Sequence, residues 1–262
     1  MTKYDVLLWS KNGSANLPRV LKRFDEVVPE KIINQKILID DCSKDNTREI
    51  ARAHNWRVVT NRGHGISEGA NTGLEFVETK TFISIEQDIL LSREWFRKIP
   101  PLLKRKNVAI ASGVRLPNSP AYLRRIQEFT LERYRKHGRT LARTLDNTIY
   151  KTSIIKDLGG FPKLPPSRAG VDRELYRSLS ERRDMRWRVD FSVISTHLRA
   201  GLRDELNHYY WYGKDNNPKK SLRILATSPL MGLTIALKKR SPESFFVYPL
   251  MRFQFLRGAL EK

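Results

Sequence analysis

The first third of the chain alternates short apolar runs with stretches of helical periodicity, and this alternation constrains the fold more than any other feature. The apolar runs of strand length cover residues 5–9, 36–40, 57–60 and 81–85. The helix-period stretches between them cover residues 15–27, 47–54 and 68–78. Strands that alternate with helices predict an α/β fold whose central sheet is mainly parallel and has helices on both faces.

Strands and helices continue to alternate after the first third, up to about residue 197, and no internal repeat is visible. We expect a strand at residues 108–113, a basic helix at 122–143, a helix at about 172–183 and a late strand from 186 that ends at His197. In the first third, Asn46 is followed three residues later by Glu49, which predicts that the helix at 47–54 begins with a capping box.

The sequence becomes more apolar from Leu222 onward. Two apolar segments follow, separated by Lys238, Lys239 and Arg240. Neither segment reaches the roughly 20 apolar residues that span a bilayer. We therefore predict C-terminal amphipathic helices, which either lie in a membrane interface or pack on the preceding part of the chain or on a second subunit; hydropathy does not separate these alternatives.

Positive charge is concentrated after the first third of the chain. The net charge is +21 over 262 residues, whereas residues 1–94 are neutral overall and residues 95–145 carry +11. This distribution predicts a neutral half that binds a small ligand and a basic half that faces a polyanion, either a nucleic acid or an anionic membrane. Cys42 is the only cysteine and the N-terminus does not resemble a signal peptide, so we expect a cytoplasmic protein.

Acidic side chains follow two of the predicted strands. Glu86 and Asp88 flank Gln87 directly after one strand, where alternate side chains project to the same side and can share a divalent cation. Asp41 follows Asp40 at another strand end, where a carboxylate can accept hydrogen bonds from a nucleobase or a ribose. The alternatives are a solvated charge pair for the first and a helix-capping Asp for the second.

Three further features have a functional and a structural interpretation. The Gly-rich segment from Arg62 to Gly69 departs from G-x-G-x-x-G and does not follow the first strand, which argues against a dinucleotide-binding dehydrogenase. It can still approach a phosphate closely, or be a flexible turn. Asp172 is a candidate general base or a helix N-terminal acid, and His197 is a candidate metal ligand or a structural histidine.

Read in order, these segments resemble glycosyltransferase family 2, whose members have the GT-A fold. The segments that carry the resemblance are VLLWSKNGSANLPRVL at residues 6–21, ILIDDCSKDNTREIA at 37–51, NRGHGISEGANTGL at 61–74 and FISIEQDILLSREW at 82–95. Gly159-Gly160-Phe161, Val171-Asp172 and the strand that ends at His197 follow in the family's order. The likeness covers residues 4–212.

The resemblance implies an inverting transfer of a sugar from a nucleotide diphosphate donor with the help of Mg²⁺ or Mn²⁺. It implies a metal site at Asp88, with Glu86 and His197, and a catalytic base at Asp172. The residues implied for the nucleotide sugar are Ser10, Lys11, Asp41, Arg62, Gly65 and Asn71. The sequence departs from the family at Glu86, where Asp is usual, at Ile89, where a further Asp is common, and at Val171, where Glu is frequent.

The expected organisation is a GT-A catalytic domain at residues 1–212, with a nucleotide-sugar half at 1–115 and an acceptor half at 116–212. A basic and apolar helical extension follows at 213–262, for which membrane contact is one of the two interpretations given above. We expect an acceptor hydroxyl or a lipid phosphate, a polyanionic or lipid-linked acceptor, and a peripheral position on the inner face of the membrane. The cations expected on the acceptor side are Arg124, Arg125, Arg133, Arg135, Lys136, Arg139 and Arg143.

Two other functions remain open from the sequence. A nucleotidyltransferase can share such a sheet and acidic metal site. A basic nucleic-acid-binding module with a vestigial pocket would also explain the charge, but the sequence lacks a recognition helix or a single-strand-binding signature, so nucleic acid is not the expected partner.

Overall fold

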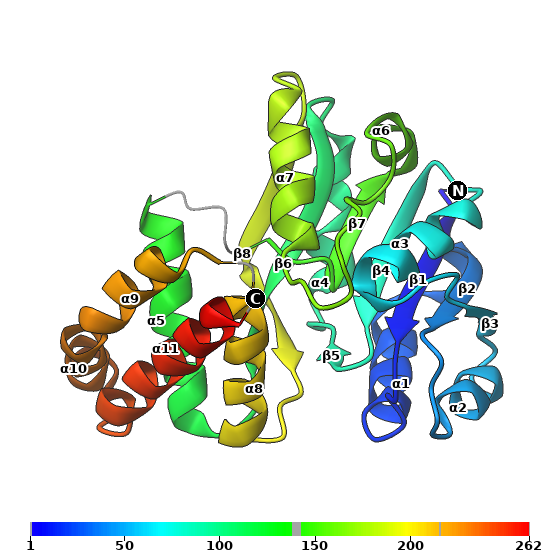
Figure 1. The fold of residues 1–262 in the computed structure, drawn as a ribbon. Coiled ribbons are helices and arrows are strands. Elements are labelled where there is room, and N and C mark those ends of the chain that lie inside the picture. Colours follow the sequence, from blue (N-terminus) through cyan, green and yellow to red (C-terminus); the bar gives the residue numbers. More distant parts are fainter. Residues whose placement is uncertain (1, 138–142, 215, 262) are drawn as a thin grey trace. The chain divides into compact units, whose positions relative to one another are not determined.

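The computed structural model describes residues 2–137, 143–214 and 216–261, and Figure 1 shows the fold. The chain forms two compact units. The first contains the described residues within 1–115, 140–166 and 171–197, and the second contains those within 116–139, 167–170 and 198–262. The first unit carries nearly all of the sheet, and the second unit is mainly helical.

Eight strands form one sheet in the order β3-β2-β1-β4-β7-β6-β8-β5. Their bounds are β1 (Tyr4–Ser10), β2 (Ile33–Asp40), β3 (Arg57–Thr60), β4 (Thr81–Glu86), β5 (Ile89–Leu90), β6 (Val108–Pro117), β7 (Asn147–Lys151) and β8 (Arg186–His197). The four strands predicted in the first third are β1 to β4, and they pair in parallel as expected. The α/β prediction is confirmed.

The later strands change the sheet from parallel to mixed. Strand β7 pairs antiparallel with β4 and with β6, and β5 pairs antiparallel with β8. The strands predicted at residues 108–113 and from 186 to His197 are β6 and β8, but apolar periodicity does not give the direction of a strand, so the antiparallel pairing was not predicted.

The helices of the first unit lie between its strands along the chain. They are α1 (Leu17–Val27), α2 (Thr47–Ala53), α3 (Gly65–Glu75), α4 (Trp95–Lys98), α6 (Thr152–Asp157) and α7 (Val171–Glu181), with short 3-10 helices η1 (Glu30–Ile32) and η2 (Pro100–Lys104). Helix α2 begins at the predicted place, but the predicted capping box is wrong. The Asn46 side chain makes no capping hydrogen bond, and Asp45 Oδ1 instead accepts from the Thr47 N–H at 3.1 Å.

Helices cover both faces of the parallel strands. Leu7 and Ile39 share a core cluster with Leu74 of α3. Gly73 allows the close approach of α3, because a Cβ there would lie 2.9 Å from Ile39 Cδ1 and 3.0 Å from Leu7 Cδ1. Neighbouring strand residues such as Leu8 are equally buried and point to the opposite face, since strand side chains alternate.

The second unit is built from α5 (Ala121–His137), α8 (Leu202–Gly213), α9 (Pro218–Ala226), α10 (Ser228–Lys239) and α11 (Ser244–Leu260). Helices α8 and α11 pack closely where Gly213 and Gly258 meet the other helix's backbone, and a Cβ at either position would collide with a carbonyl oxygen. Arg199 is buried and its Nε lies 3.2 Å from Glu205 Oε2.

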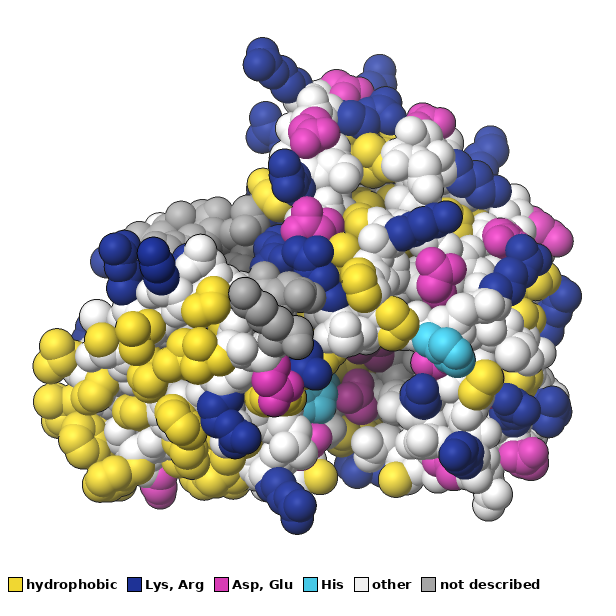
Figure 2. All heavy atoms as spheres, viewed as in Figure 1, with side chains coloured by type: hydrophobic (Ala, Val, Ile, Leu, Met, Phe, Trp, Pro, Cys, Tyr) yellow, Lys and Arg dark blue, Asp and Glu magenta, His cyan; other side chains and the backbone are white. Residues whose placement is uncertain are grey.

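The C-terminal helices predicted from the sequence are present, and none of the described helices is long and apolar enough to cross a bilayer. Figure 2 shows apolar side chains gathered on the surface of α9, α10 and α11. Helix α5 ends at His137, and Arg139 of the predicted basic helix lies outside the described residues.

Candidate active site

The carboxyl ends of three parallel strands meet at one edge of the sheet. Strand pairing places Ser10 of β1 beside Asp40 of β2, and Trp9 of β1 beside Glu86 of β4. The polar clusters that the sequence places after these strands therefore lie along a single edge, which is where open α/β sheets bind ligands.

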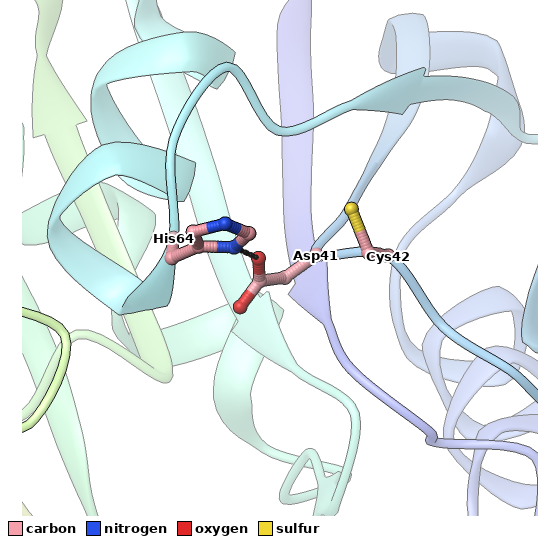
Figure 3. A group of neighbouring side chains, drawn as sticks. All are labelled: Asp41, Cys42 and His64. Carbon is pink, nitrogen blue, oxygen red and sulfur yellow. Dashed lines mark hydrogen bonds and ion pairs between the residues drawn. The ribbon is translucent and has the colours of Figure 1, made fainter.

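Asp41 is the centre of the first cluster, just after β2 (Figure 3). Its Oδ1 lies 2.9 Å from His64 Nδ1, while Oδ2 accepts a hydrogen bond from the Gly65 N–H at 3.1 Å and from Lys11 Nζ at 3.4 Å. Gly65 has φ of +81°, a conformation that glycine adopts readily. Burial alone would raise the pKa of Asp41, but these hydrogen bonds and the Lys11 charge lower it, so Asp41 is ionised at neutral pH.

Asp41, Cys42 and His64 are also the one group of three metal-ligand side chains, within the described part of the chain, whose ligand atoms all lie within 4.8 Å of one another. The Asp41 carboxylate already has three hydrogen-bonding neighbours at these distances. Cys42 and His64 are exposed, whereas Asp41 is buried. We interpret the group as a hydrogen-bonded turn that presents Asp41.

Gln87 holds the turn after β1 and was missed by sequence reasoning. Its Oε1 accepts hydrogen bonds from Ser10 Oγ at 2.5 Å and from the Lys11 N–H at 2.8 Å, and its Nε2 donates to the Lys11 carbonyl at 3.1 Å. The residue between the two acidic positions thus positions Ser10 and Lys11 beside Asp41.

Two of the predicted nucleotide-binding residues make other contacts. Arg62 forms an ion pair with Glu75, at 2.7 Å between Nη1 and Oε2. The Asn71 side chain holds the backbone of Phe161, because Oδ1 accepts from its N–H at 2.8 Å and Nδ2 donates to its carbonyl at 2.9 Å. Asn71 therefore anchors the segment after Gly160 to α3.

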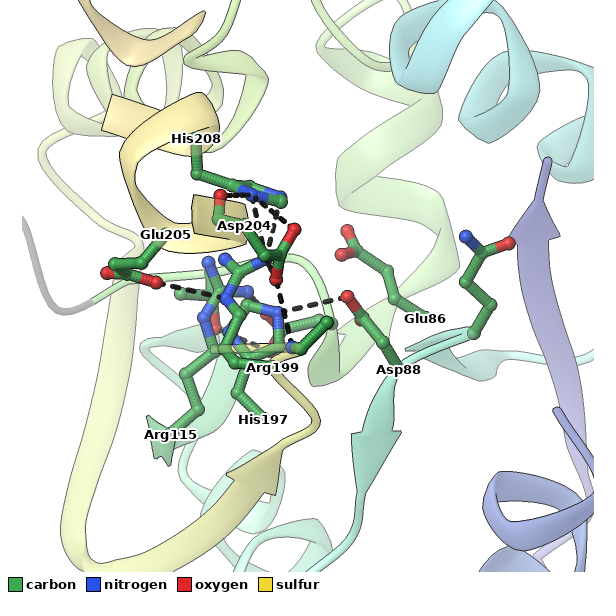
Figure 4. Close-up of polar contacts among 12 residues, drawn as sticks. Glu86, Asp88, Arg115, His197, Arg199, Asp204, Glu205 and His208 are labelled. Carbon is green, nitrogen blue, oxygen red and sulfur yellow. Dashed lines mark hydrogen bonds and ion pairs between the residues drawn. The ribbon is translucent and has the colours of Figure 1, made fainter. Parts of the chain in front are cut away.

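Asp88 and His197 meet at the second cluster (Figure 4). The antiparallel pairing of β5 with β8 places Ile89 opposite His197, and so brings the residue before β5 next to the last residue of β8. His197 Nε2 and Asp88 Oδ2 are 3.0 Å apart, with side chains 8% and 22% exposed. The sequence suggested that Asp88 and His197 lie close together only through the order of the family's motifs. In the structure, the pairing of the short strand β5 with β8 brings the two side chains together.

Glu86 lies between several charges. Its Oε1 accepts a hydrogen bond from Trp9 Nε1 at 3.1 Å. Burial raises the pKa of Glu86 to about 7; the Arg115 guanidinium opposes this, while the negative charges of Asp88 and Asp172 add to it. Glu86 is therefore partly protonated near neutral pH, unlike an ordinary surface carboxylate.

Asp172 lies in the first turn of α7, where its Oδ1 accepts the Arg173 N–H at 2.8 Å. Burial raises its pKa, and the charge of Arg115 partly opposes the shift. Because Asp172 and Asp88 both act on the ionisation of Glu86, the candidate base and the candidate metal ligand belong to one electrostatic cluster of the first unit.

Arg115 is the cation of this cluster and was not predicted. It forms an ion pair with the fully buried Asp146, which also accepts hydrogen bonds from Thr144 Oγ1 at 2.9 Å and Asn147 Nδ2 at 2.7 Å. The sequence contains one sign of this role: Arg115 comes two residues after the expected end of the strand at 108–113. The observed strand, β6, continues to Pro117 and so includes Arg115.

The sequence matches the description "Glycosyl transferase family 2" over residues 6–179, about two thirds of the chain. A comparison with curated proteins found no match. Among solved structures, the mannosyltransferase PcManGT from Pyrobaculum calidifontis, in complex with GDP-Man and Mn²⁺, is similar with a TM-score of 0.63 and 15% identity, covering 99% of this chain and 76% of the other.

Two further structures share the fold. Glucosyl-3-phosphoglycerate synthase from Mycobacterium tuberculosis has a TM-score of 0.57 and 18% identity, covering 75% of this chain and 72% of the other. S. aureus TarS 1–349 has a TM-score of 0.55 and 15% identity, covering 81% and 64%. These likenesses confirm the GT-A architecture. The family match decides between the functions left open by the sequence: the protein is a glycosyltransferase and belongs to glycosyltransferase family 2.

Proposed function

We propose that the protein transfers a sugar from a nucleotide diphosphate sugar to an acceptor with inversion of the anomeric carbon, using Mn²⁺ or Mg²⁺ at Asp88 and Asp172 as the general base. One observation carries the proposal: within a chain that matches glycosyltransferase family 2, His197 Nε2 at the end of β8 lies 3.0 Å from Asp88 Oδ2, next to the carboxyl end of β4. The electrostatic effect of both Asp88 and Asp172 on Glu86 supports a single site for the leaving group and the acceptor.

Asp41, Ser10 and Lys11 are proposed to hold the nucleotide. An ionised carboxylate accepts N–H groups of a nucleobase, and Asp41 is held ionised by its donors. The His64 side chain is 64% exposed, and a nucleobase bound at Asp41 would replace its contact with the carboxylate. Solved structures of the same fold contain GDP-Man or UDP-Glc, which supports a nucleotide sugar as the donor. Arg62 and Asn71 are proposed to support the nucleotide site indirectly, Arg62 through its ion pair with Glu75 and Asn71 through the backbone of Phe161.

Asp88 and His197 are proposed to hold the metal ion. A carboxylate oxygen and an imidazole nitrogen 3.0 Å apart form a mixed donor set that suits Mn²⁺ better than the oxygen-preferring Mg²⁺. When bound, the ion supplies positive charge that stabilises the departing diphosphate. Glu86 has a raised pKa and accepts a hydrogen bond from Trp9, so it is proposed as a third, weaker ligand of the ion.

Asp172 is proposed to remove the proton from the attacking acceptor hydroxyl. Burial raises its pKa and so increases its affinity for that proton. Attack on the face opposite the leaving group inverts the anomeric carbon. A lipid phosphate acceptor is already ionised at neutral pH, and Asp172 would then contribute less.

The acceptor side is proposed to face a polyanionic or lipid-linked acceptor at the inner face of a membrane. Residues 213–262 are proposed as an extension of a catalytic domain of residues 1–212.

Several of the cations expected on the acceptor side have partners within the protein. Arg124 Nε bonds Glu128 at 3.0 Å, Arg125 Nη1 donates to the Arg240 carbonyl at 2.8 Å, and Arg143 stacks on Tyr176 at 3.8 Å. Arg135 and Lys136 are exposed and would contribute about 1 kcal/mol each near anionic lipid.

The experiment that tests this function uses purified protein, labelled nucleotide sugars and Mn²⁺. We expect nucleoside diphosphate release with at least one donor, and an inverted anomeric centre in the product by NMR. Asp88→Asn should lose this activity. Release of nucleoside monophosphate with transfer of a nucleotidyl group, or equal activity of Asp88→Asn and the wild type, would contradict the proposal.

A further inference from the structure

The second unit leaves large apolar side chains exposed to solvent. Within the described residues, Ile194 is the one large exposed apolar side chain outside α9, α10 and α11. The others are Leu222, Leu230, Leu233, Leu237, Phe245, Phe246, Leu250, Phe253 and Leu260. Contiguous exposed apolar surface of this kind marks an interaction site, and Figure 2 shows these helices forming such a surface.

Helix α11 is apolar on two opposite faces. Phe246, Leu250, Phe253 and Leu260 recur at spacings of four, three and seven residues and so form one stripe along the helix. Phe246 is 73% exposed and Leu260 63% exposed. The opposite face, which includes Met251, packs in the core of the unit. A helix with apolar residues all around is normally covered on every side, so the exposed stripe requires an occupant.

Helix α10 adds a second stripe. Leu230, Leu233 and Leu237 lie at spacings of three and four residues, and Leu230 and Leu237 are each 72% exposed. On its other side, Gly232 lies against the backbone of Phe245 and Ser244, with a Cβ there only 3.0 Å from their carbonyl oxygens. The two helices therefore pack side by side and form a hairpin that carries both stripes.

Exposed cations accompany the apolar stripes. They are Lys238 and Arg240 at the turn between α10 and α11, Lys219, Lys220 and Arg223 on α9, and Arg257 within the stripe of α11. Glu243 and Glu261 are the exposed acids of these segments within residues 216–261. Apolar side chains flanked by lysine and arginine match an anionic lipid interface, where the apolar groups enter the acyl boundary and the cations contact headgroups.

The same charges argue against a second copy of the chain as the occupant. In a symmetric dimer both subunits use the same surface, so Lys238 and Arg240 of each chain would approach the like-charged set of the other. No comparable set of exposed acids among the described residues of α9 to α11 would compensate this repulsion.

We propose that the α10–α11 hairpin docks on the surface of an anionic bilayer, with the stripes of Leu230, Leu237, Phe246 and Phe253 inserted among the lipid chains. The inference deepens the proposed function, on which its purpose rests, because it assigns the membrane contact to named faces of two helices. A monotopic contact of this kind needs no spanning helix, in keeping with the described helices.

Vesicle co-sedimentation tests the proposal with the full-length protein. We expect binding to vesicles that contain phosphatidylglycerol, weaker binding to phosphatidylcholine alone, and weakening by salt. The triple variant Leu237→Asp, Phe246→Asp, Phe253→Asp should bind at least about tenfold more weakly. The single variant Phe246→Asp should also bind more weakly than the wild type, and Ile194→Asp is its matched control, since it places the same single charge on an exposed apolar position in β8 and should bind like the wild type.

A site-specific probe keeps the test valid if the triple variant does not fold. In a Cys42→Ser background the chain has no other cysteine, so Phe246→Cys carries a single polarity-sensitive fluorophore. Its emission should shift to the blue with phosphatidylglycerol vesicles, whereas a label at Ser180→Cys, exposed on α7, should not respond.

The proposal would be overturned if the wild-type protein stayed in solution with every vesicle, or if a folded triple variant bound like the wild type. It would also be overturned if the wild type formed a dimer in sedimentation equilibrium, the triple variant did not, and neither protein bound vesicles. Nucleotide-sugar binding measured without lipid reports separately on the proposed function. Vesicle binding without donor binding refutes that function and leaves the docking surface, and the reverse result refutes the surface alone.

Discussion

Glu86 shows how burial changes the meaning of an acidic motif. Burial and the negative charges of Asp88 and Asp172 raise the pKa of its carboxyl group from the ordinary value of 4.5 to about 7, against the opposing effects of the Arg115 charge and the hydrogen bond from Trp9. Folding therefore increases the affinity of Glu86 for a proton. The resulting contribution to stability is complete below about pH 4.5 and is lost as the pH rises to about 7.

Glu86→Gln tests this ionisation. Glutamine keeps an acceptor for Trp9 and cannot ionise, so the free energy of unfolding at about pH 8 should exceed that of the wild type by roughly 1–3 kcal/mol. At about pH 4.5 the two proteins should be nearly equally stable. Urea unfolding with a chelator present measures both. A difference that is the same at both pH values would contradict the assigned environment.

Asp172→Asn tests the proposed base. If the acceptor is a hydroxyl, kcat should fall by about 10²–10⁴. The wild type should lose activity as the pH falls through the pKa of Asp172, which burial places above the ordinary value of 3.8. The residual activity of Asp172→Asn should lack this acidic limb. Glu174→Gln in the same turn of α7 is the control, and an equal loss in both variants would show that α7 rather than the base is disturbed.

Cys42 offers a direct report on Asp41. It is the single cysteine of the chain, is exposed and follows Asp41 directly. If a nucleotide binds at Asp41, a saturating nucleoside diphosphate should slow the labelling of Cys42 by a thiol reagent several-fold. Asp41→Ala should abolish the protection. Labelling that no nucleotide slows, in a protein that nonetheless turns over donor, would move the nucleobase away from Asp41.

At the scale of elements, the sequence predicted what depends on neighbours along the chain. Strands β1 to β4, the helices between them and α7 follow from apolar spacing and were predicted close to their observed bounds. The match to the family confirms the fold that they implied. The direction of β7 and the existence of the two-residue β5 depend on pairing with distant segments, and so were not predictable from periodicity.

The candidate site divides in the same way. Asp41, Asp88 and Asp172 were identified because each belongs to a local motif. Trp9, Gln87 and Arg115 were missed because their roles arise from strand register and burial: Trp9 reaches Glu86 only through the pairing of β1 with β4, and Arg115 only through a strand extended beyond its apolar run. Hydrogen bonds across the sheet have no signature in a single sequence.

The close packing of α8 and α11 gives a prediction for an element. Gly258 lies against the carbonyl of Tyr210, so Gly258→Ala must push the helices apart. We expect a loss of about 1–3 kcal/mol and a lower melting temperature. Leu260→Ala, on the exposed side of the same turn, should change stability little. Equal melting temperatures of Gly258→Ala and the wild type would show that the helices are less closely packed than described.

At the scale of the whole molecule, charge and exposed apolar surface are distributed unevenly over the chain. The neutral first third contains the strand ends proposed to hold the donor, and the basic later part includes the hairpin proposed to meet lipid. The sequence predicted the uneven charge, but only the structure identifies which apolar side chains are left exposed. Fold and family together describe a family 2 glycosyltransferase, and the exposed apolar surface supports the proposed lipid-linked acceptor.

The central claim is that Asp88 fastens a cation to a donor nucleotide, and metal-dependent thermal stabilisation measures this most directly. A ligand at about 100 times its Kd stabilises the folded state by about 2.7 kcal/mol. We predict that nucleoside diphosphates with Mn²⁺ raise the melting temperature of the wild type and of Asp172→Asn alike, while Asp88→Asn loses the Mn²⁺-dependent part. The absence of stabilisation by every nucleotide, or an unchanged response of Asp88→Asn, would contradict the account.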